Sequence, residues 1–208
     1  MYSRKLFFIF LLVVGVVGCS DTEVKPPLTA QAHYQQGLAA QQQGNFKSAI
    51  EHFEEAVTLQ PDFGLAYCAL GAARVSLDQR NLATTAYRQC VVLIPANVDG
   101  HAALGVLLAT GAQPNEAVVH LQRSIDLGTQ DAQVYFRLAE IRNAEGQCEV
   151  TVGLYERALA LNPGLTAARH GLDLARKNNC KKPVVHHPKP RTEKTFIGGA
   201  KALKPGDW

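Results

Sequence analysis

The stretch that decides the fold is residues 30–63, which run AQAHYQQGLAAQQQGNFKSAIEHFEEAVTLQPDF. Its Gly37 recurs as Gly71 and Gly105 at a spacing of thirty-four residues, and Ala139 holds the fourth place. The same spacing links several other positions, among them Ala49, Ala83 and Ala117; Phe53, Tyr87, Leu121 and Tyr155; and Pro61, Pro95 and Pro163. A fixed period of this length is the signature of a repeat array. The period predicts four repeats, at 30–63, 64–97, 98–131 and 132–165.

Each repeat contains two stretches in which apolar residues recur at helical spacing. Small residues at the Gly37 and Ala49 positions let two antiparallel helices approach closely, and the large side chain at the Phe53 position fills the space above them. A helix pair leaves one face uncovered, so the pairs are expected to stack into a solenoid whose last pair needs a cap. Residues 166–180 are expected to form that capping helix, with Ala168 and Leu172 turned inward.

The residues that carry a family resemblance are densest in the first repeat. Gly37, Ala49, Phe53, Ala56 and Pro61 together resemble the tetratricopeptide repeat. The resemblance implies an all-α fold, a right-handed superhelical solenoid of four helix pairs with a C-terminal capping helix. The third repeat departs most from the pattern, with Gly111, Pro114 and Thr129.

The first nineteen residues have the features of an export signal. Arg4 and Lys5 precede an apolar run from Leu6 to Val17, which is too short for a membrane span. Val16-Val17-Gly18-Cys19 resembles a bacterial lipobox, in which the cysteine takes a lipid. We expect residues 1–18 to be a lipoprotein signal peptide and residues 19–29 to be the lipidated Cys19 and a flexible tether. The alternative is an ordinary signal peptide that contains a cysteine.

The lipobox also predicts a location. A lipid on Cys19 places the protein in the bacterial cell envelope, facing the periplasm. Ser20 favours the outer membrane by resemblance to enterobacterial sorting, whereas Asp21 keeps the choice between inner and outer membrane open.

Charge is distributed unevenly along the chain. Residues 20–180 hold twelve Lys and Arg against sixteen Asp and Glu, whereas residues 181–208 hold seven against two. The body lacks the clustered cations that bind phosphates, so nucleic acid is not expected as a partner. The tail 181–208 is rich in proline, and we expect it to be disordered. Its apolar residues among cations suit three targets, the partner first, then anionic lipid or cell-wall polymer, then the chain's own solenoid; a solvated tail without a target is the alternative.

The motifs of catalysis and of cofactor binding are missing from the sequence. It has no nucleophile elbow, no HExxH zinc motif, no phosphate-binding loop and no haem attachment site, so we expect no enzyme, no cofactor and no small-molecule substrate. His101 is expected to be a packed core residue, and His52 and His120 are expected to be solvated surface residues. No metal site is expected, because His186-His187 stands without further ligands.

Four cysteines remain after Cys19, in what is expected to be an oxidising compartment. Cys148 begins the second helix of the fourth repeat, and Cys180 stands at the end of the expected capping helix, so both are expected at one edge of the solenoid. We predict a disulfide between them. Cys68 and Cys90 lie in the two helices of the second repeat, where either a disulfide or two buried thiols fits.

The resemblance implies a binding surface. Tetratricopeptide folds bind peptides or helices on the concave face made by the first helix of each pair. Carried over by repeat position, this groove is lined by Tyr34, Leu38, Leu65, Ala69, Ala72, Val75, Ala102, Val106, Phe136, Arg137 and Glu140. The cationic set with which chaperone-binding relatives hold a C-terminal carboxylate is missing, so the groove suits an apolar segment whose register Arg137 and Glu140 can fix. The alternative is that the small residues merely permit tight curvature.

These features predict a lipid-anchored periplasmic scaffold that binds a protein partner. In plan it is similar to the tetratricopeptide lipoproteins of type IV pilus and secretion systems, which assist secretin assembly, although those usually carry more repeats. One alternative is an adaptor that recruits cell-wall hydrolases or proteases. Another is an accessory subunit of a cytochrome maturation or electron-transfer assembly.

Overall fold

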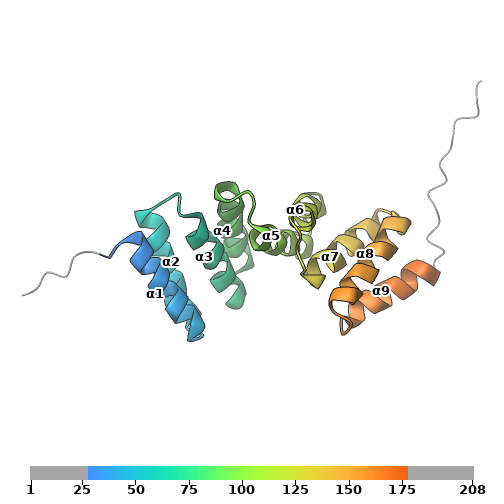
Figure 1. The fold of residues 1–208 in the computed structure, drawn as a ribbon, viewed down its shortest axis with the longest axis horizontal. Helices are drawn as coiled ribbons and strands as arrows, with labels where there is room; N and C mark the ends of the chain where they lie inside the picture. The colour runs from blue at the N-terminus through green and yellow to red at the C-terminus, as the bar shows by residue number, and fades with distance from the viewer. Residues whose placement is uncertain (1–27, 178–208) are drawn as a thin grey trace, which may run out of the picture.

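The structure, a computed structural model, describes residues 28–177, and within them every regular element is a helix (Figure 1). The helices are α1 (Ala30–Gln42), α2 (Phe46–Leu59), α3 (Gly64–Ser76), α4 (Arg80–Leu93), α5 (Val98–Thr110), α6 (Pro114–Asp126), α7 (Ala132–Ala144), α8 (Cys148–Leu161) and α9 (Thr166–Lys177). None of these helices is long and apolar enough to cross a membrane. The signal peptide, Cys19, Cys180 and the tail 181–208 lie outside the described residues.

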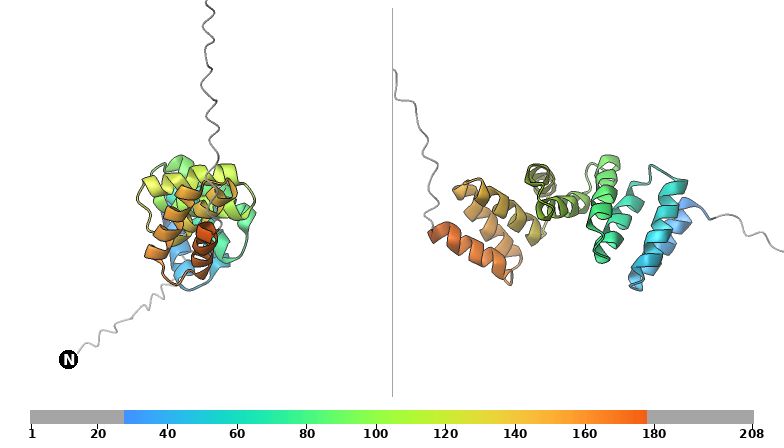
Figure 2. Two further views of the ribbon diagram at one scale, coloured as in Figure 1. Left: turned by 90° about the vertical axis from the view of Figure 1, so that its right-hand side faces the viewer. Right: turned by 180° about the vertical axis from the view of Figure 1, so that it is seen from behind.

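The helices pack as four consecutive pairs, α1 with α2, α3 with α4, α5 with α6 and α7 with α8, and α9 packs on α8. Each pair begins at the first residue of a predicted repeat, at positions 30, 64, 98 and 132. Figure 2 shows the pairs following one another along one axis, with α1 and α9 at opposite ends. This architecture confirms the prediction of an all-α solenoid of four helix pairs with a capping helix.

The small residues of the period bring the two helices of a pair into contact. A Cβ on Gly37 would lie 2.5 Å from the Phe53 ring, and one on Gly105 would lie 2.8 Å from the Leu121 side chain. Phe53 and Leu121 are fully buried, and the cores that they anchor run through the solenoid from pair to pair. Ala168, Leu172 and Ala175 of α9 are buried against Tyr155, as expected of a cap.

The turn inside each pair requires one residue with positive φ. These residues are Gly44, Asp78, Ala112 and Gly146, with φ values of 75°, 55°, 59° and 74°. They follow the thirty-four-residue period, as a repeated helix ending requires. Glycine adopts this conformation freely, whereas for an L-residue with a side chain it costs about 1–2 kcal/mol. The turns at Asp78 and Ala112 therefore adopt the same backbone conformation as the outer two turns, although they lack the glycine that this conformation favours.

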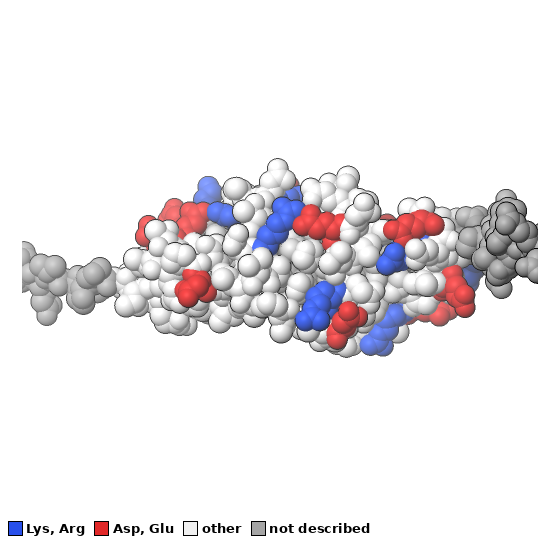
Figure 3. All heavy atoms as spheres, turned by 90° about the horizontal axis from the view of Figure 1, so that it is seen from above, with Lys and Arg blue, Asp and Glu red and all other residues white. Residues whose placement is uncertain are grey.

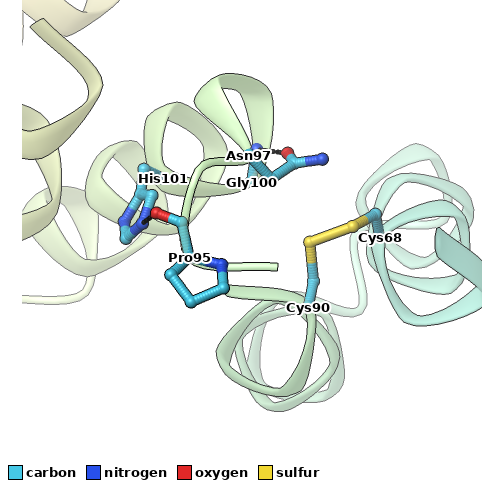
Figure 4. The surroundings of a disulfide bond; sticks show 6 residues. All are labelled: Cys68, Cys90, Pro95, Asn97, Gly100 and His101. Atoms are coloured by element: carbon cyan, nitrogen blue, oxygen red, sulfur yellow. Dashed lines mark hydrogen bonds between the residues drawn. A yellow bond between two sulfur atoms is a disulfide. The ribbon is translucent and has the colours of Figure 1, made fainter. Parts of the chain in front are cut away.

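A disulfide joins the two helices of the second pair. Cys68 of α3 and Cys90 of α4 are bonded, with their Cα atoms 5.0 Å apart, so of the two alternatives the structure has the disulfide. Figure 4 shows this bond beside Gly100, where α5 begins. Cys148 is also a disulfide cysteine. Its predicted partner, Cys180, lies outside the described residues, so the pairing with Cys180 stays a prediction.

Candidate partner-binding groove

The first helices of the pairs form one face of the solenoid. On this face α1 packs on α3, α5 packs on α7 and α7 packs on α9, whereas α3 and α5 contact each other less. A cavity of about 490 Å³ opens at this place, between α3, α5 and α7. It is lined by Val75, Asp78, Arg80, Tyr87, Asp99, Ala102, Ala103, Val106, Leu107, Thr110, Asp131, Gln133 and Arg137. We call this cavity the groove.

The floor of the groove is apolar because of the composition of α5. This helix carries apolar or small residues on nearly all of its sides. Leu104 and Leu108 point into the core and are fully buried, so the opposite side of α5 presents Ala102, Ala103 and Val106 to the groove. Val75 of α3 forms one wall and is 44% exposed. Side chains this small leave room for the side chains of another chain.

The rim of the groove is charged, and its cations are already paired. Arg80 binds Asp78 at 2.8 Å, and Arg137 binds Glu140 at 2.7 Å while its guanidinium lies over the Phe136 ring. The carboxylates of Asp99 and Asp131 remain without a salt-bridge partner among residues 28–177. The groove therefore has a negative excess around an apolar floor.

Tyr87 of α4 brings a hydroxyl to the groove. Burial raises the pKa of Tyr87 to about 12, and the nearby Asp99 carboxylate contributes to this rise by repelling a phenolate. The hydroxyl is therefore protonated at neutral pH and can donate a hydrogen bond. The Tyr87 hydroxyl is thus a polar group next to Asp99 in an otherwise apolar wall.

The residues predicted for the groove fall into three groups. Val75, Ala102, Val106 and Arg137 line the cavity, and Glu140 lines an adjoining one of about 360 Å³ with Arg137. Tyr34, Leu38 and Ala69 pack on the core of the first two pairs. Ala72 packs on the central core, and Leu65 is an exposed residue of α3.

Phe136 corrects one prediction. It was expected to face a partner, but it is only 6% exposed and packs in the core of the last pair, with its ring 6.2 Å from that of Tyr155. Phe136 shares this core with Ala168, Leu172 and Ala175 of α9.

Sequence reasoning missed Asp78, Arg80, Tyr87, Leu107 and Asp131 in the groove. Asp78 lies in a turn, Arg80 begins α4 and Asp131 caps α7, where its side chain accepts the Gln133 backbone N–H at 2.8 Å. Asp78 and Asp131 lie outside the helices, where helical periodicity assigns no face, so the repeat pattern gave no signal for these two residues.

Two histidines form a cluster away from the groove. His101 is buried, as predicted. The expectation that His120 is a solvated surface residue is wrong, because its Nδ1 lies 3.0 Å from Nδ1 of His101 and the rings stack at 5.2 Å. His52 is likewise half-buried, with its ring 5.7 Å from that of His33. Outward positions of the second helices are thus partly covered by their neighbours.

The described residues contain no group of three His, Cys, Asp or Glu side chains placed to hold a metal ion. Figure 3 shows one face of the solenoid, on which Lys and Arg alternate with Asp and Glu over a largely uncharged surface. The groove is thus the feature of the described chain best suited to hold another molecule, because it combines a cavity with an apolar floor and a charged rim.

Stacked helix pairs with a groove along their first helices are the architecture of a tetratricopeptide solenoid. Residues 30–63 match the family model of the tetratricopeptide repeat. The fold is similar to that of a MamA protein, with a TM-score of 0.65 and 22% identity over 72% of this chain and 82% of that one. MamA from Desulfovibrio magneticus RS-1 has a TM-score of 0.62 and 19% identity, over 73% of this chain and 87% of that one.

The tetratricopeptide protein YrrB, which has an unusual peptide-binding site, is also similar. Its TM-score is 0.65 at 19% identity, with 72% of this chain and 77% of YrrB covered. At these identities the likeness establishes the fold.

Proposed function

We propose that this protein is a non-enzymatic scaffold that binds an apolar segment of a protein partner in the groove. The observation that carries the proposal is the apolar floor of α5 beneath a polar rim, open between α3 and α7. A segment laid across it can bury side chains on Ala103 and Val106, while Arg137 and Tyr87 fix its register. The peptide-binding site of YrrB, which shares the fold, supports the same use of the solenoid.

We further propose that the scaffold is held at the membrane by a lipid on Cys19 and works in the periplasm. The lipobox, the apolar run before it and the polar residues after it support this location. On the resemblance to tetratricopeptide lipoproteins, its task is to assist assembly of an envelope complex such as a type IV pilus or a secretin. The lipid keeps the groove near the membrane in which such complexes assemble.

The groove proposal is tested by placing charge on one wall, at Val75, and on the floor, at Val106. Val75→Glu with Val106→Glu should reduce capture of the partner from crosslinked envelopes at least tenfold, because a carboxylate on the floor must be desolvated when an apolar segment binds. The matched control is Val92→Glu with Val119→Glu, two residues that are 69% and 63% exposed on second helices. Circular dichroism should show equal helix content in both variants.

Mass spectrometry of the captured proteins tests the proposed task. Secretin or pilus subunits support it, whereas cell-wall hydrolases, proteases or haem proteins point to one of the alternatives. Equal capture by the groove variant and by its control would place the partner on another surface.

The anchor is tested separately with Cys19→Ala. The variant should lose labelling by a radioactive fatty acid and leave the membrane fraction, because each buried methylene of a lipid chain contributes about 0.8 kcal/mol to anchoring. Unchanged labelling would show that the lipid is attached elsewhere or is absent. Cys148→Ala is the control, since it removes a cysteine outside the lipobox.

A further inference from the structure

The groove combines an apolar floor with unpaired negative charge. Ala103 and Val106 form the floor, and Asp99 and Asp131 stand at the end where α5 and α7 begin. The groove's two arginines, Arg80 and Arg137, are each paired with a carboxylate, so a bound segment meets a negative excess. Such a site favours apolar side chains flanked by cations.

The chain itself carries a segment of this chemistry. Residues 194–204 run KTFIGGAKALK, in which Lys194 and Lys201 flank Phe196-Ile197 and Lys204 follows Leu203. The eight residues from Lys194 to Lys201 span at most about 25 Å when extended. α5 lines the groove from Asp99 to Thr110, a rise of about 17 Å, so the extended segment is long enough to cover this lining.

The segment can reach the groove from the end of α9. α9 packs on α7 and α7 packs on α5, and packed helices lie about 8–10 Å apart, so α5 lies about 20 Å from α9. The path along the groove adds about one helix length, or about 20 Å, to this distance between α9 and α5. The seventeen Cα–Cα steps from Lys177 to Lys194 span up to about 55–60 Å, which exceeds the sum of these two distances.

We propose that residues 194–204 occupy the groove of their own chain and compete with the partner for it. This inference rests on the proposed function, in that both use the same groove. A tethered segment is present at an effective concentration in the millimolar range, so even a weakly binding tail fills the groove. A partner must displace the tail, and its apparent affinity falls by the fraction of chains whose groove is filled.

The test uses a photo-crosslinking amino acid in the full chain. A benzophenone side chain at Thr110, an exposed residue of the groove, should crosslink to peptides from 190–208 at least tenfold more than one at Val119 on α6. Mixing isotopically light and heavy chains distinguishes a link within one chain from a link between copies. Asp99→Asn with Asp131→Asn should lower the yield severalfold without unfolding α7, since an asparagine side chain caps a helix as an aspartate does.

Charge reversal in the tail completes the test. Lys194→Glu, Lys201→Glu and Lys204→Glu together should abolish the crosslink and raise partner capture severalfold. Lys181→Glu, Lys182→Glu and Lys189→Glu make the same change in charge outside the segment and should do neither.

The outcomes separate the two proposals. A tail crosslink that is absent, or that forms only between copies, overturns the inference, and the groove proposal stands if the floor variants still lose the partner. A tail crosslink within one chain supports the inference. If partner capture is then insensitive to the floor variants, the proposed function is wrong while the inference about the tail stands.

Discussion

His101 and His120 form a hydrogen-bonded pair whose protonation is coupled. Nε2 of His101 lies 3.2 Å from the Pro95 carbonyl oxygen and donates to it, an arrangement visible in Figure 4. Nδ1 of the neutral His101 is then an acceptor, and His120 donates its Nδ1–H to it. A second proton on His101 breaks this bond and places two N–H groups face to face.

The pair predicts that the protein loses stability in mild acid. Burial lowers the pKa of both histidines. Arg123 lowers the pKa of His101 further. For His120, the His101 ring and Arg88 also lower the pKa, whereas the Glu116 carboxylate raises it. The unfolded chain therefore takes up these protons first, so stability falls as pH drops below about 6.5 toward the lowered values.

Tm should therefore be lower at pH 5.5 than at pH 7.5. Replacing the pair by His101→Phe and His120→Leu should flatten the dependence in thermal unfolding followed by circular dichroism. The exposed His170 provides the control, since the His170→Gln variant should retain the pH dependence of Tm. An unchanged slope in the double variant would assign the acid sensitivity to other groups.

Two glycines inside helices have opposite roles. A Cβ on Gly105 would lie 2.9 Å from the backbone nitrogen of Leu121, which cannot move away by a rotamer change, whereas a Cβ on Gly153 meets nothing within 4 Å. Gly105→Ala should lower the free energy of unfolding by about 1–3 kcal/mol through overpacking. Gly153→Ala should raise it by about 0.5–1 kcal/mol, because alanine favours the helix. Urea unfolding of both variants measures the difference, and equal effects would contradict the close approach of α5 and α6.

At the scale of elements, α9 acts as the cap through one apolar face. Leu172 is buried against the last pair, and Leu174 on the same helix is 43% exposed. Leu172→Ala should lower the free energy of unfolding by about 2–3 kcal/mol, whereas Leu174→Ala should change it by less than about 0.5 kcal/mol. Chemical denaturation provides the comparison. Similar losses for the two substitutions would mean that α9 stabilises the solenoid without docking by this face.

The disulfide between α3 and α4 should stabilise the second pair. It closes a loop with a sequence separation of 22, which corresponds to about 3 kcal/mol in the chain-entropy account. Cys68→Ala with Cys90→Ala, unfolded without reductant, should lose about that amount while keeping the helix content. A loss below about 1 kcal/mol would indicate that the packing of Tyr87 on Gly71 already holds the two helices together.

At the scale of the whole molecule, each helix pair contacts only its neighbours, so stability should be graded along the solenoid. α5 and α6 have pairs on both sides, whereas α1 ends the stack. Hydrogen exchange followed by mass spectrometry should show the slowest amides in α5 and α6 and faster exchange in α1. One common exchange rate for all the described helices would show instead that the solenoid opens as a single unit.

The sequence predicted the repeats because their contacts are periodic. Gly37 meets Phe53 and Gly71 meets Tyr87 within single pairs, so one spacing reports every such contact. The resemblance to the tetratricopeptide repeat, carried over by repeat position, placed Val75, Ala102, Val106 and Arg137 at the groove.

By itself, then, the sequence determined the helix pairs, their order and the face that carries the groove. Only the tertiary structure decided that Phe136 is buried, that Asp78 and Asp131 stand at the rim, and that His120 meets His101. These outcomes depend on how each pair is rotated against the next and on where the turns lead the chain. That rotation results from side chains of several pairs packing at once, which no single repeat encodes.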